Sequence, residues 1–326
     1  MRVGVNPEKN KLENNFQYQH RVIIPVFIPN DTEDYYKESL EVFDTGLNSL
    51  FSTINPAITG VTIINNSSYL KVDDIIKKYN SKGLIDKYVT YNDNKGKVYA
   101  VINESRSCFE EFITIADADV LFLNGWEKKV FEIFKTIPKT GVVAPVPSPN
   151  LALYKNTTVF FDKYFKGNMR YDKIVSDKDN DLFLEGMGNS ALLTRNNREF
   201  SWKQKQYFLN STGSPVIGAG HFVATYRREV LEYNRAFPEK KFKKGYEEFY
   251  LDDPSDKLGL YRLSTSKTYA YHIGNKMDDF SKNYRFTGDD KLGKNEIASL
   301  KKIETSLIPF WVRNLVFKVL YKFLKL

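Results

Sequence analysis

The sequence predicts an α/β fold with a mixed, mostly parallel central sheet flanked by helices and followed by a C-terminal amphipathic helix. Short apolar runs alternate with segments of helical spacing, as in a parallel sheet whose two faces are covered. The chain has 326 residues, of which 42% are hydrophobic, enough for one large domain with appendages. One apolar run, at 112–123, carries two aspartates a residue apart.

The first half of the chain gives a regular order of elements. β-Branched and aromatic residues predict strands at 21–28, 60–64, 87–91, 112–123 and 141–146. Apolar residues that recur every three or four positions predict helices at 35–51, 72–79, 98–109 and 126–136. The first helix has its apolar positions at Leu40, Phe43, Leu47 and Leu50.

The pattern is weaker elsewhere. Residues 150–215 are polar and aromatic and give no clear elements. Residues 1–19 read as a polar lead-in, and 276–300, rich in Gly, Asp and Lys, is expected to be a linker or mobile loop. Strands are expected at 218–225 and 269–273, and helical segments at 228–235 and 246–250.

Composition narrows the class of protein. The net charge of +8 suits phosphate-bearing ligands, anionic membrane surfaces or nucleic acid. We expect no nucleic-acid binding, because the basic residues gather with aliphatic ones near the C-terminus and no nucleic-acid-binding module appears. Cys108 is the single cysteine, so no disulfide forms within the chain. The N-terminus has no apolar leader and no run reaches the roughly 18 apolar residues of a membrane span, so we expect a cytoplasmic protein.

Asp117 and Asp119 are the clearest candidate functional residues. They follow a strand-like run, and residues i and i+2 of an extended segment point to the same side. With no Lys or Arg near them in the sequence, the two carboxylates would repel each other unless a cation lies between them. Hard divalent ions such as Mg²⁺ or Mn²⁺ prefer such oxygen ligands. A solvated turn at a strand end is the alternative.

Five segments carry a resemblance to a known family. They are the strand at 21–28, the polar-ended strand at 61–68, Asn94-Lys95-Gly96-Lys97, Asp117-Ala118-Asp119, and the acidic Tyr246-Glu247-Glu248 with Tyr271-His272-Ile273-Gly274-Asn275 further on. Their order resembles that of nucleotide-sugar-dependent glycosyltransferases of the GT-A fold, family 2 in particular. The resemblance covers 20–275, and it implies a nucleotide-sugar-binding half at 20–125 and an acceptor half at 126–275.

The resemblance implies a metal-dependent donor site that holds Mn²⁺ or Mg²⁺. Asp119 would bind the metal directly, Asp117 would contact the ribose or the metal through water, and His272 would be a further ligand, although a lone histidine is more often structural. The family usually has Asp where this chain has Asn65. A UDP-sugar is the favoured donor, and the implied donor-binding residues are Pro25, Asn65, Asn66, Lys97, Asp117 and Ala118.

An inverting transferase also needs a general base for the acceptor hydroxyl. Glu248 is the first choice and Glu247 the second, with Asp252 and Asp253 third, because desolvation and a neighbouring acid raise the pKa of a carboxylate. The alternative is a charged helix start, where acids are favoured. The resemblance also places Gly220 and His221 at the acceptor; a tight turn is the simpler explanation.

The tail at 301–326 predicts an amphipathic membrane-association helix. Asn314, Lys318, Lys322 and Lys325 form one polar stripe, aromatic and aliphatic residues fill the rest, and no acid follows Glu304. This composition fits residues 308–326 lying on the anionic inner face of the cell membrane. It would suit a glycan or polyprenyl-linked acceptor in surface polysaccharide synthesis. Docking of the helix on the body, or on a second copy in a homo-oligomer, is the alternative.

Two other functions compete with sugar transfer. The departures at Asn65 and Glu248 fit a catalytically silent, membrane-tethered partner of another transferase that binds a nucleotide sugar or a glycan. A nucleotidyltransferase would carry a Gly-rich loop with Arg and Lys directly after the first strand, and 25–30 lacks one. A metal-dependent, inverting glycosyltransferase is therefore the leading expectation.

Overall fold

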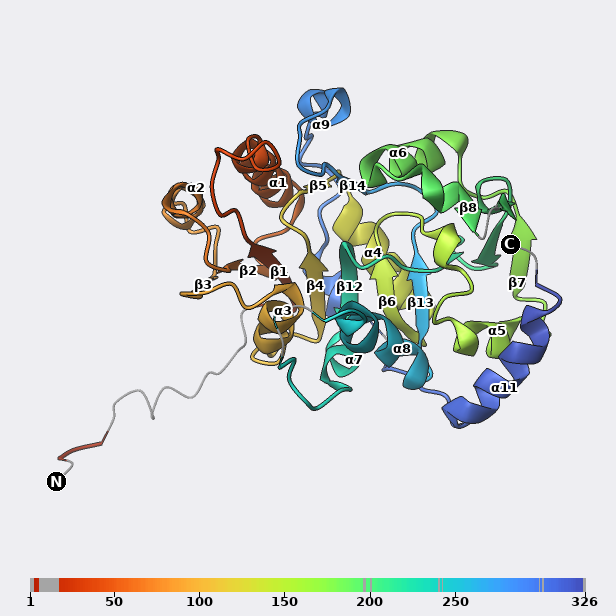
Figure 1. Cartoon of the computed structure of the whole chain (residues 1–326). Coiled ribbons are helices and arrows are strands. Elements are labelled where there is room, and N and C mark those ends of the chain that lie inside the picture. The colour runs from red at the N-terminus through yellow and green to blue at the C-terminus, as the bar shows by residue number, and fades with distance from the viewer. Residues whose placement is uncertain are drawn as a thin grey trace.

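The computed structural model describes residues 3–5, 18–195, 198–199, 201–239, 241, 243–298, 300 and 302–324. Ten of its strands form one mixed sheet in the order β3-β2-β1-β4-β12-β6-β13-β11-β10-β7 (Figure 1). Helices flank this sheet and a C-terminal helix follows it, which confirms the predicted α/β class. Most of the 1–19 lead-in lies outside the described residues.

Four parallel strands form the N-terminal half of the sheet. They are β1 (His20–Val26), β2 (Thr59–Asn65), β3 (Lys87–Thr90) and β4 (Phe112–Ala116). The helices that connect them are α1 (Ser39–Thr53), α2 (Leu70–Asn80) and α3 (Lys97–Ser105). Because parallel strands end at one edge of a sheet, the residues after β1, β2 and β4 come together there.

The core lies on both faces of this half-sheet. Alternate β1 residues point to opposite faces, so Val22 and Ile24 join one apolar cluster and Ile23 joins another. The first cluster includes buried residues of α1 and α2, and the second includes those of α3 and α7 (Arg228–Glu232). Figure 1 shows these two pairs of helices on opposite sides of the sheet.

The second half of the sheet mixes directions. Strand β12 (Val223–Arg227) runs antiparallel between β4 and β6 (Thr140–Ala144), and β13 (Tyr261–Ser264) is parallel to β6. Antiparallel pairing continues through β11 (Val216–Ile217), β10 (Gln206–Leu209) and β7 (Met169–Asp172). The helices of this half include α4 (Trp126–Thr136), α5 (Thr157–Lys163), α6 (Asp177–Met187) and α8 (Asp253–Lys257).

The described residues of 276–300 pack on the domain, unlike the linker or mobile loop expected there. It holds the short helices α9 (Asp279–Asn283) and α10 (Lys294–Ala298). Leu292 is fully buried, and its carbonyl accepts a hydrogen bond from Asn55 Nδ2 at 2.8 Å. Tyr284 OH accepts another from the Asn124 backbone N–H at 2.9 Å. Buried apolar side chains spaced among the polar residues tie this segment down.

The C-terminal helix α11 (Phe310–Tyr321) docks on α5 (Figure 1). Phe317 meets Phe160 with ring centroids 5.5 Å apart. The buried Arg313 donates to the carbonyls of Asp256 and Lys257 at 2.8 and 3.1 Å, which are last-turn carbonyls of α8. This is the docking on the body that the sequence left as an alternative. Within the described ranges, no helix is both long and apolar enough to cross a membrane.

Candidate active site

Asp117, Asp119 and His272 come together at the edge of the sheet. The expected strand at 112–123 is interrupted at the aspartates, which lie between β4 and β5 (Val120–Phe122). Strand β14 (Ala270–His272) pairs antiparallel with β5 and places His272 opposite Val120. His272 Nε2 lies 3.4 Å from Asp119 Oδ2. One ligand atom from each of the three residues lies within 4.8 Å of the others.

The chemistry of this cluster fits a divalent cation. Asp119 Oδ1 is buried and, within the described part of the chain, has no hydrogen-bond partner. The carbonyl of Gly186 accepts a hydrogen bond from His272 Nδ1 at 3.0 Å, so Nε2 is the ring nitrogen that faces Asp119. Gly186 permits this approach, since a Cβ there would lie 2.8 Å from the His272 carbonyl oxygen. Burial raises the pKa of Asp119, and His272 opposes that rise.

Lys97 pairs with one of the two aspartates, a partner that the local sequence did not reveal. Its Nζ lies 2.5 Å from Asp117 Oδ1 and 3.3 Å from Glu247 Oε1. Burial lowers the pKa of Lys97, but the attraction of Asp117 and Glu247 outweighs burial and raises it, so Lys97 is charged. Lys97 is the first residue of α3 and follows Gly96, whose φ of +83° is in the left-handed region.

A cleft of about 310 Å³ opens beside the metal-competent cluster. The predicted donor residues that line it are Pro25, Asn66, Lys97, Asp117 and Ala118. Asn66 also shapes the rim, because its side chain accepts from Lys95 N–H at 2.8 Å and donates to Asn94 Oδ1 at 3.1 Å.

Asn65 is not among the residues that line this cleft, and its donor contact remains a prediction. Its side chain donates to Asp73 Oδ1 at 2.6 Å and accepts from Ser68 N–H at 2.7 Å, and the residue is buried. The two neighbouring asparagines thus have different hydrogen-bond partners, and Asn66 is the one that lines the cleft.

Tyr35 and Tyr36 line the donor-side cleft and escaped the sequence analysis. The apolar spacing predicted a helix from Tyr35, but α1 begins at Ser39. Asn30 holds the preceding turn, because its Oδ1 accepts from Thr32 N–H and Glu33 N–H at 3.1 and 3.0 Å. Asparagine followed by Asp and Thr after Pro29 was the signal that could have moved the helix start.

A second cleft, of about 570 Å³, contains three of the four predicted catalytic acids, and Asp253 is not among the residues that line it. Glu247, Glu248, Asp252, His221 and Lys97 line it, and Lys97 lines the donor-side cleft as well. The acids come from a π-helical turn, Glu248–Asp252, and the residue before it.

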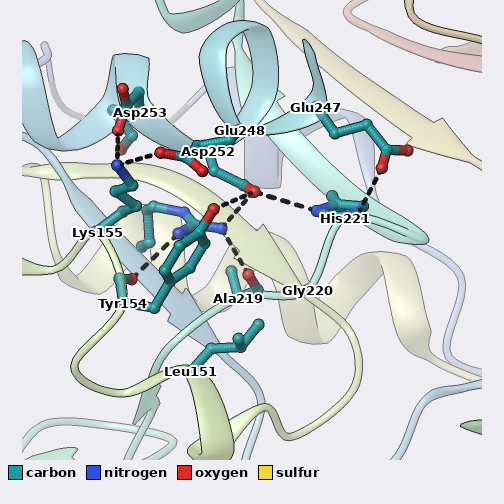
Figure 2. Close-up of polar contacts among 12 residues, drawn as sticks. Leu151, Tyr154, Lys155, Ala219, Gly220, His221, Glu247, Glu248, Asp252 and Asp253 are labelled. Carbon is teal, nitrogen blue, oxygen red and sulfur yellow. Dashed lines mark hydrogen bonds and ion pairs between the residues drawn. The ribbon is translucent and has the colours of Figure 1, made fainter. Parts of the chain in front are cut away.

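His221 lies between two carboxylates (Figure 2). Its Nδ1 is 3.2 Å from Asp252 Oδ2 and its Nε2 is 3.4 Å from Glu247 Oε2. Burial lowers the pKa of His221, but hydrogen bonds to Asp252 and Glu247 outweigh burial and raise it to about 9. The hydrogen bond to His221, with the charge of Lys97, lowers the pKa of Glu247 to about 2. Ion pairing therefore outweighs the desolvation that was expected to raise the pKa of Glu247.

Asp252 links His221 to Arg262 and Tyr154 through hydrogen bonds. It is buried, and Arg262 Nη2 donates to its Oδ1 at 2.6 Å while Tyr154 OH donates to its Oδ2 at 3.3 Å. Burial alone would raise the pKa of Asp252, but the positive charges of Arg262 and His221 outweigh burial, so the pKa of Asp252 is lowered. Arg262 and Tyr154 were missed, since nothing local in the sequence links them to the acids.

Lys155 joins the other two acids (Figure 2). Its Nζ lies 2.7 Å from Glu248 Oε1 and 2.6 Å from Asp253 Oδ1. Glu248 is 47% exposed and lines the cleft, whereas Asp253 is mostly buried and also pairs with Lys257 at 3.0 Å. Gly220 donates its backbone N–H to Ser148 Oγ at 3.1 Å and is not among the residues that line the cleft.

Solved structures similar to this chain include a mannosyltransferase and S. aureus TarS. A mannosyltransferase from Pyrobaculum calidifontis, in complex with GDP-Man and Mn²⁺, is 13% identical with a TM-score of 0.44, covering 78% of this chain and 55% of that one. S. aureus TarS 1–349 is 14% identical with a TM-score of 0.45, covering 78% and 60%. Its complex with UDP-GlcNAc has a TM-score of 0.44 at 14% identity, covering 82% and 61%. This chain thus spans less than two thirds of each.

No curated protein sequence matches the chain. The model of one family, glycosyl transferase family 2, matches residues 35–233, which is more than half of the chain. The match includes Lys97, Asp117, Asp119 and His221 and ends before the acidic turn. In agreement with the resemblance of its motifs, the chain belongs to glycosyl transferase family 2.

Proposed function

We propose that this protein is a divalent-metal-dependent, inverting glycosyltransferase that moves a sugar from a nucleotide-sugar donor to an acceptor hydroxyl. The observation that carries the proposal is the position of Lys97. It lines both clefts and pairs with Asp117 of one and Glu247 of the other. A donor in the first cleft and an acceptor in the second would therefore meet at this side chain.

The first cleft suits a nucleotide diphosphate. Asp119 and His272 would hold Mn²⁺ or Mg²⁺, with Asp117 beside them, and the cation would neutralise charge on the leaving diphosphate. Lys97 is charged and partly exposed, so it can turn from Asp117 towards a phosphate oxygen. The rings of Tyr35 and Tyr36 offer a surface for a nucleobase at the other end of the cleft. UDP-sugars are the favoured donors.

The second cleft suits an acceptor and its base. Glu248 is our proposed general base, because it is half exposed and opens on the cleft. Glu247 has a pKa of about 2, too low for an efficient base near neutral pH, so we assign it to positioning Lys97 and His221. Asp252 is fully bonded and buried, and its role is to hold His221.

The test combines donor binding with turnover. A panel of nucleotide sugars and nucleoside diphosphates is screened by thermal shift, with Mn²⁺ and with a chelator. One nucleoside diphosphate should stabilise the protein only with metal, by about 2.7 kcal/mol at a hundred times its Kd. Asp119→Ala should remove this stabilisation, while Asp74→Ala, which changes an exposed acid on α2, should keep it.

Glu248→Gln completes the test. It should keep the donor-induced stabilisation and lower the rate of sugar transfer by about 10²–10⁴-fold. Metal-dependent stabilisation that persists in Asp119→Ala would contradict the metal site, and normal transfer by Glu248→Gln would contradict the base.

A silent donor-binding partner is the second candidate function. The observation that favours it is that each acid of the second cleft is paired with a cation. Such a protein would show donor-induced stabilisation with no release of nucleoside diphosphate for any acceptor.

We further propose that α11 lies on an anionic membrane surface. Trp311, Leu315 and Val319 form a row at spacing i, i+4, i+8 and are 69%, 60% and 56% exposed. Lys318 and Lys322 are exposed beside this row. Peripheral attachment to the inner face of the cell membrane would bring a lipid-linked glycan acceptor within reach.

A further inference from the structure

We infer that the acceptor carries a phosphate group next to the hydroxyl that receives the sugar. The inference rests on the proposed function and defines its substrate class. It comes from Lys241, Lys243 and Lys244, which we call the lysine rim. All three are exposed and line the second cleft, whose floor holds Glu247, Glu248 and Asp252.

Each acid on the floor of the cleft already has a cationic partner. Glu247 is paired with Lys97 and His221, Glu248 with Lys155, and Asp252 with Arg262. His221 is charged at neutral pH, because its pKa is about 9. The floor acids therefore need no further cation.

The lysine rim adds positive charge that is not paired among the described residues. Lys241, Lys243 and Lys244 make no ion pair with a described carboxylate, and the Lys243 ammonium lies 5.5 Å from the centroid of the Tyr246 ring. Three unpaired ammonium groups around one opening attract an anion, and phosphate oxygens are strong acceptors for them.

Described residues of the loop that carries the rim contact the body at two places. A Cβ on Gly96 would lie 2.0 Å from the Lys241 carbonyl oxygen, so the loop backbone packs directly on the turn before Lys97. Arg106 Nη1 donates to the Arg235 carbonyl at 2.9 Å and its guanidinium lies 4.5 Å from the Phe237 ring, which ties down the start of the loop. The rim is thus held beside the junction of the two clefts.

The rim belongs to the acceptor side. Its three side chains line the second cleft and are not among the residues that line the donor-side cleft, where Lys97 is the lysine present. A phosphate at the rim leaves the adjoining hydroxyl free to reach Glu248 on the floor. Two acceptors present this chemistry, a glycan on a prenyl diphosphate and a polyol chain joined by phosphodiesters.

The test measures acceptor binding without a donor. Isothermal titration calorimetry is run with a water-soluble prenyl-diphosphate sugar, a short phosphodiester-linked polyol and a neutral oligosaccharide. At least one phosphate-bearing probe should bind more tightly than the neutral one, and its affinity should fall at about 0.5 M salt. The probe that binds identifies the source of the phosphate.

Lys243→Gln with Lys244→Gln tests the rim itself. This double variant should weaken binding of the phosphate-bearing probe about tenfold, since two exposed charge pairs together contribute roughly that much. The control Lys166→Gln with Lys205→Gln removes the same charge from exposed lysines elsewhere and should bind normally. Equal binding of the neutral probe, or equal loss in variant and control, would overturn the inference.

Donor binding separates the two failures. Thermal stabilisation by a nucleoside diphosphate with Mn²⁺ should be unchanged in the Lys243→Gln, Lys244→Gln variant. If that stabilisation is lost in the variant, the rim serves the donor and the inference is wrong. If the unaltered protein lacks it, the proposed function fails instead.

Discussion

His221 illustrates how neighbouring charges decide what a residue can do. A histidine beside a catalytic glutamate would ordinarily be a candidate base, since its unperturbed pKa is near 6.5. Here Asp252 and Glu247 bracket the ring, and its pKa of about 9 keeps it protonated at neutral pH. His221 therefore orients carboxylates and cannot accept the proton of an acceptor hydroxyl.

This protonation can be measured directly. The chain has three histidines, so the ring protons of His221 can be assigned by NMR after a single substitution. We expect His221 to titrate near pH 9, and to titrate at lower pH in Asp252→Asn, which removes one charged partner. A His221 pKa near 6.5 in the unaltered protein would contradict the network.

The same shifts give a pH dependence of stability. The pKa of His221 is higher in the folded than in the unfolded state, so its contribution is complete below about pH 6.5 and is lost as pH rises through about 9. The pKa of Glu247 is lower when folded, so its contribution is complete above about pH 4.5 and is lost as pH falls through about 2. Between about pH 4.5 and pH 6.5, both groups therefore make their full contribution to the stability of the fold.

At the scale of single elements, α11 combines two roles that its sequence presents as alternatives. The polar stripe through Asn314 and Lys318 suggested a helix with one wide apolar face. The structure divides that face, because Phe317 and Leu320 pack on the body while Trp311 and Leu315 remain exposed. Arg313, an unremarked residue in the sequence, is the buried centre of the docking because it reaches the carbonyls that end α8.

The exposed half of α11 predicts vesicle binding. We expect the protein to sediment with anionic phosphatidylglycerol vesicles and much less with neutral phosphatidylcholine vesicles. Trp311→Ser with Leu315→Ser should weaken this binding at least about tenfold, because each side chain inserted contributes more than 1 kcal/mol. The control Leu70→Ser with Phe165→Ser alters equally exposed apolar residues elsewhere and should bind normally. Equal sedimentation of both variants would contradict the membrane proposal.

At the scale of the molecule, the fold was predictable where signals are local. Apolar runs gave β1, β2 and β4, and the spacing of Asp117 and Asp119 gave the metal-competent tip. Ion pairs between distant residues were not predictable, because the partners of a charged residue depend on the finished packing. Lys97 pairs with Glu247, which lies 150 positions later in the sequence, and Arg262 of β13 pairs with Asp252. The packing of the described residues in 276–300 likewise depends on a distant contact, since the buried Leu292 accepts a hydrogen bond from Asn55, just after α1.

The tail tests how far the domain depends on its own C-terminus. Removing residues 308–326 exposes the surface under Phe317 and Leu320 and leaves the carbonyls of Asp256 and Lys257 without Arg313. Burial of two such side chains contributes about 3–6 kcal/mol as an upper limit, so we expect the shortened chain to unfold at clearly lower urea. Leu315→Ser, on the exposed face, should leave the urea midpoint unchanged.

Because the donor-side cleft shares no residue with α11, stabilisation by a nucleoside diphosphate with Mn²⁺ should survive in the shortened chain at low temperature. An unchanged midpoint would mean that α11 does not stabilise the body, and a lost donor response would mean that the tail supports the first cleft.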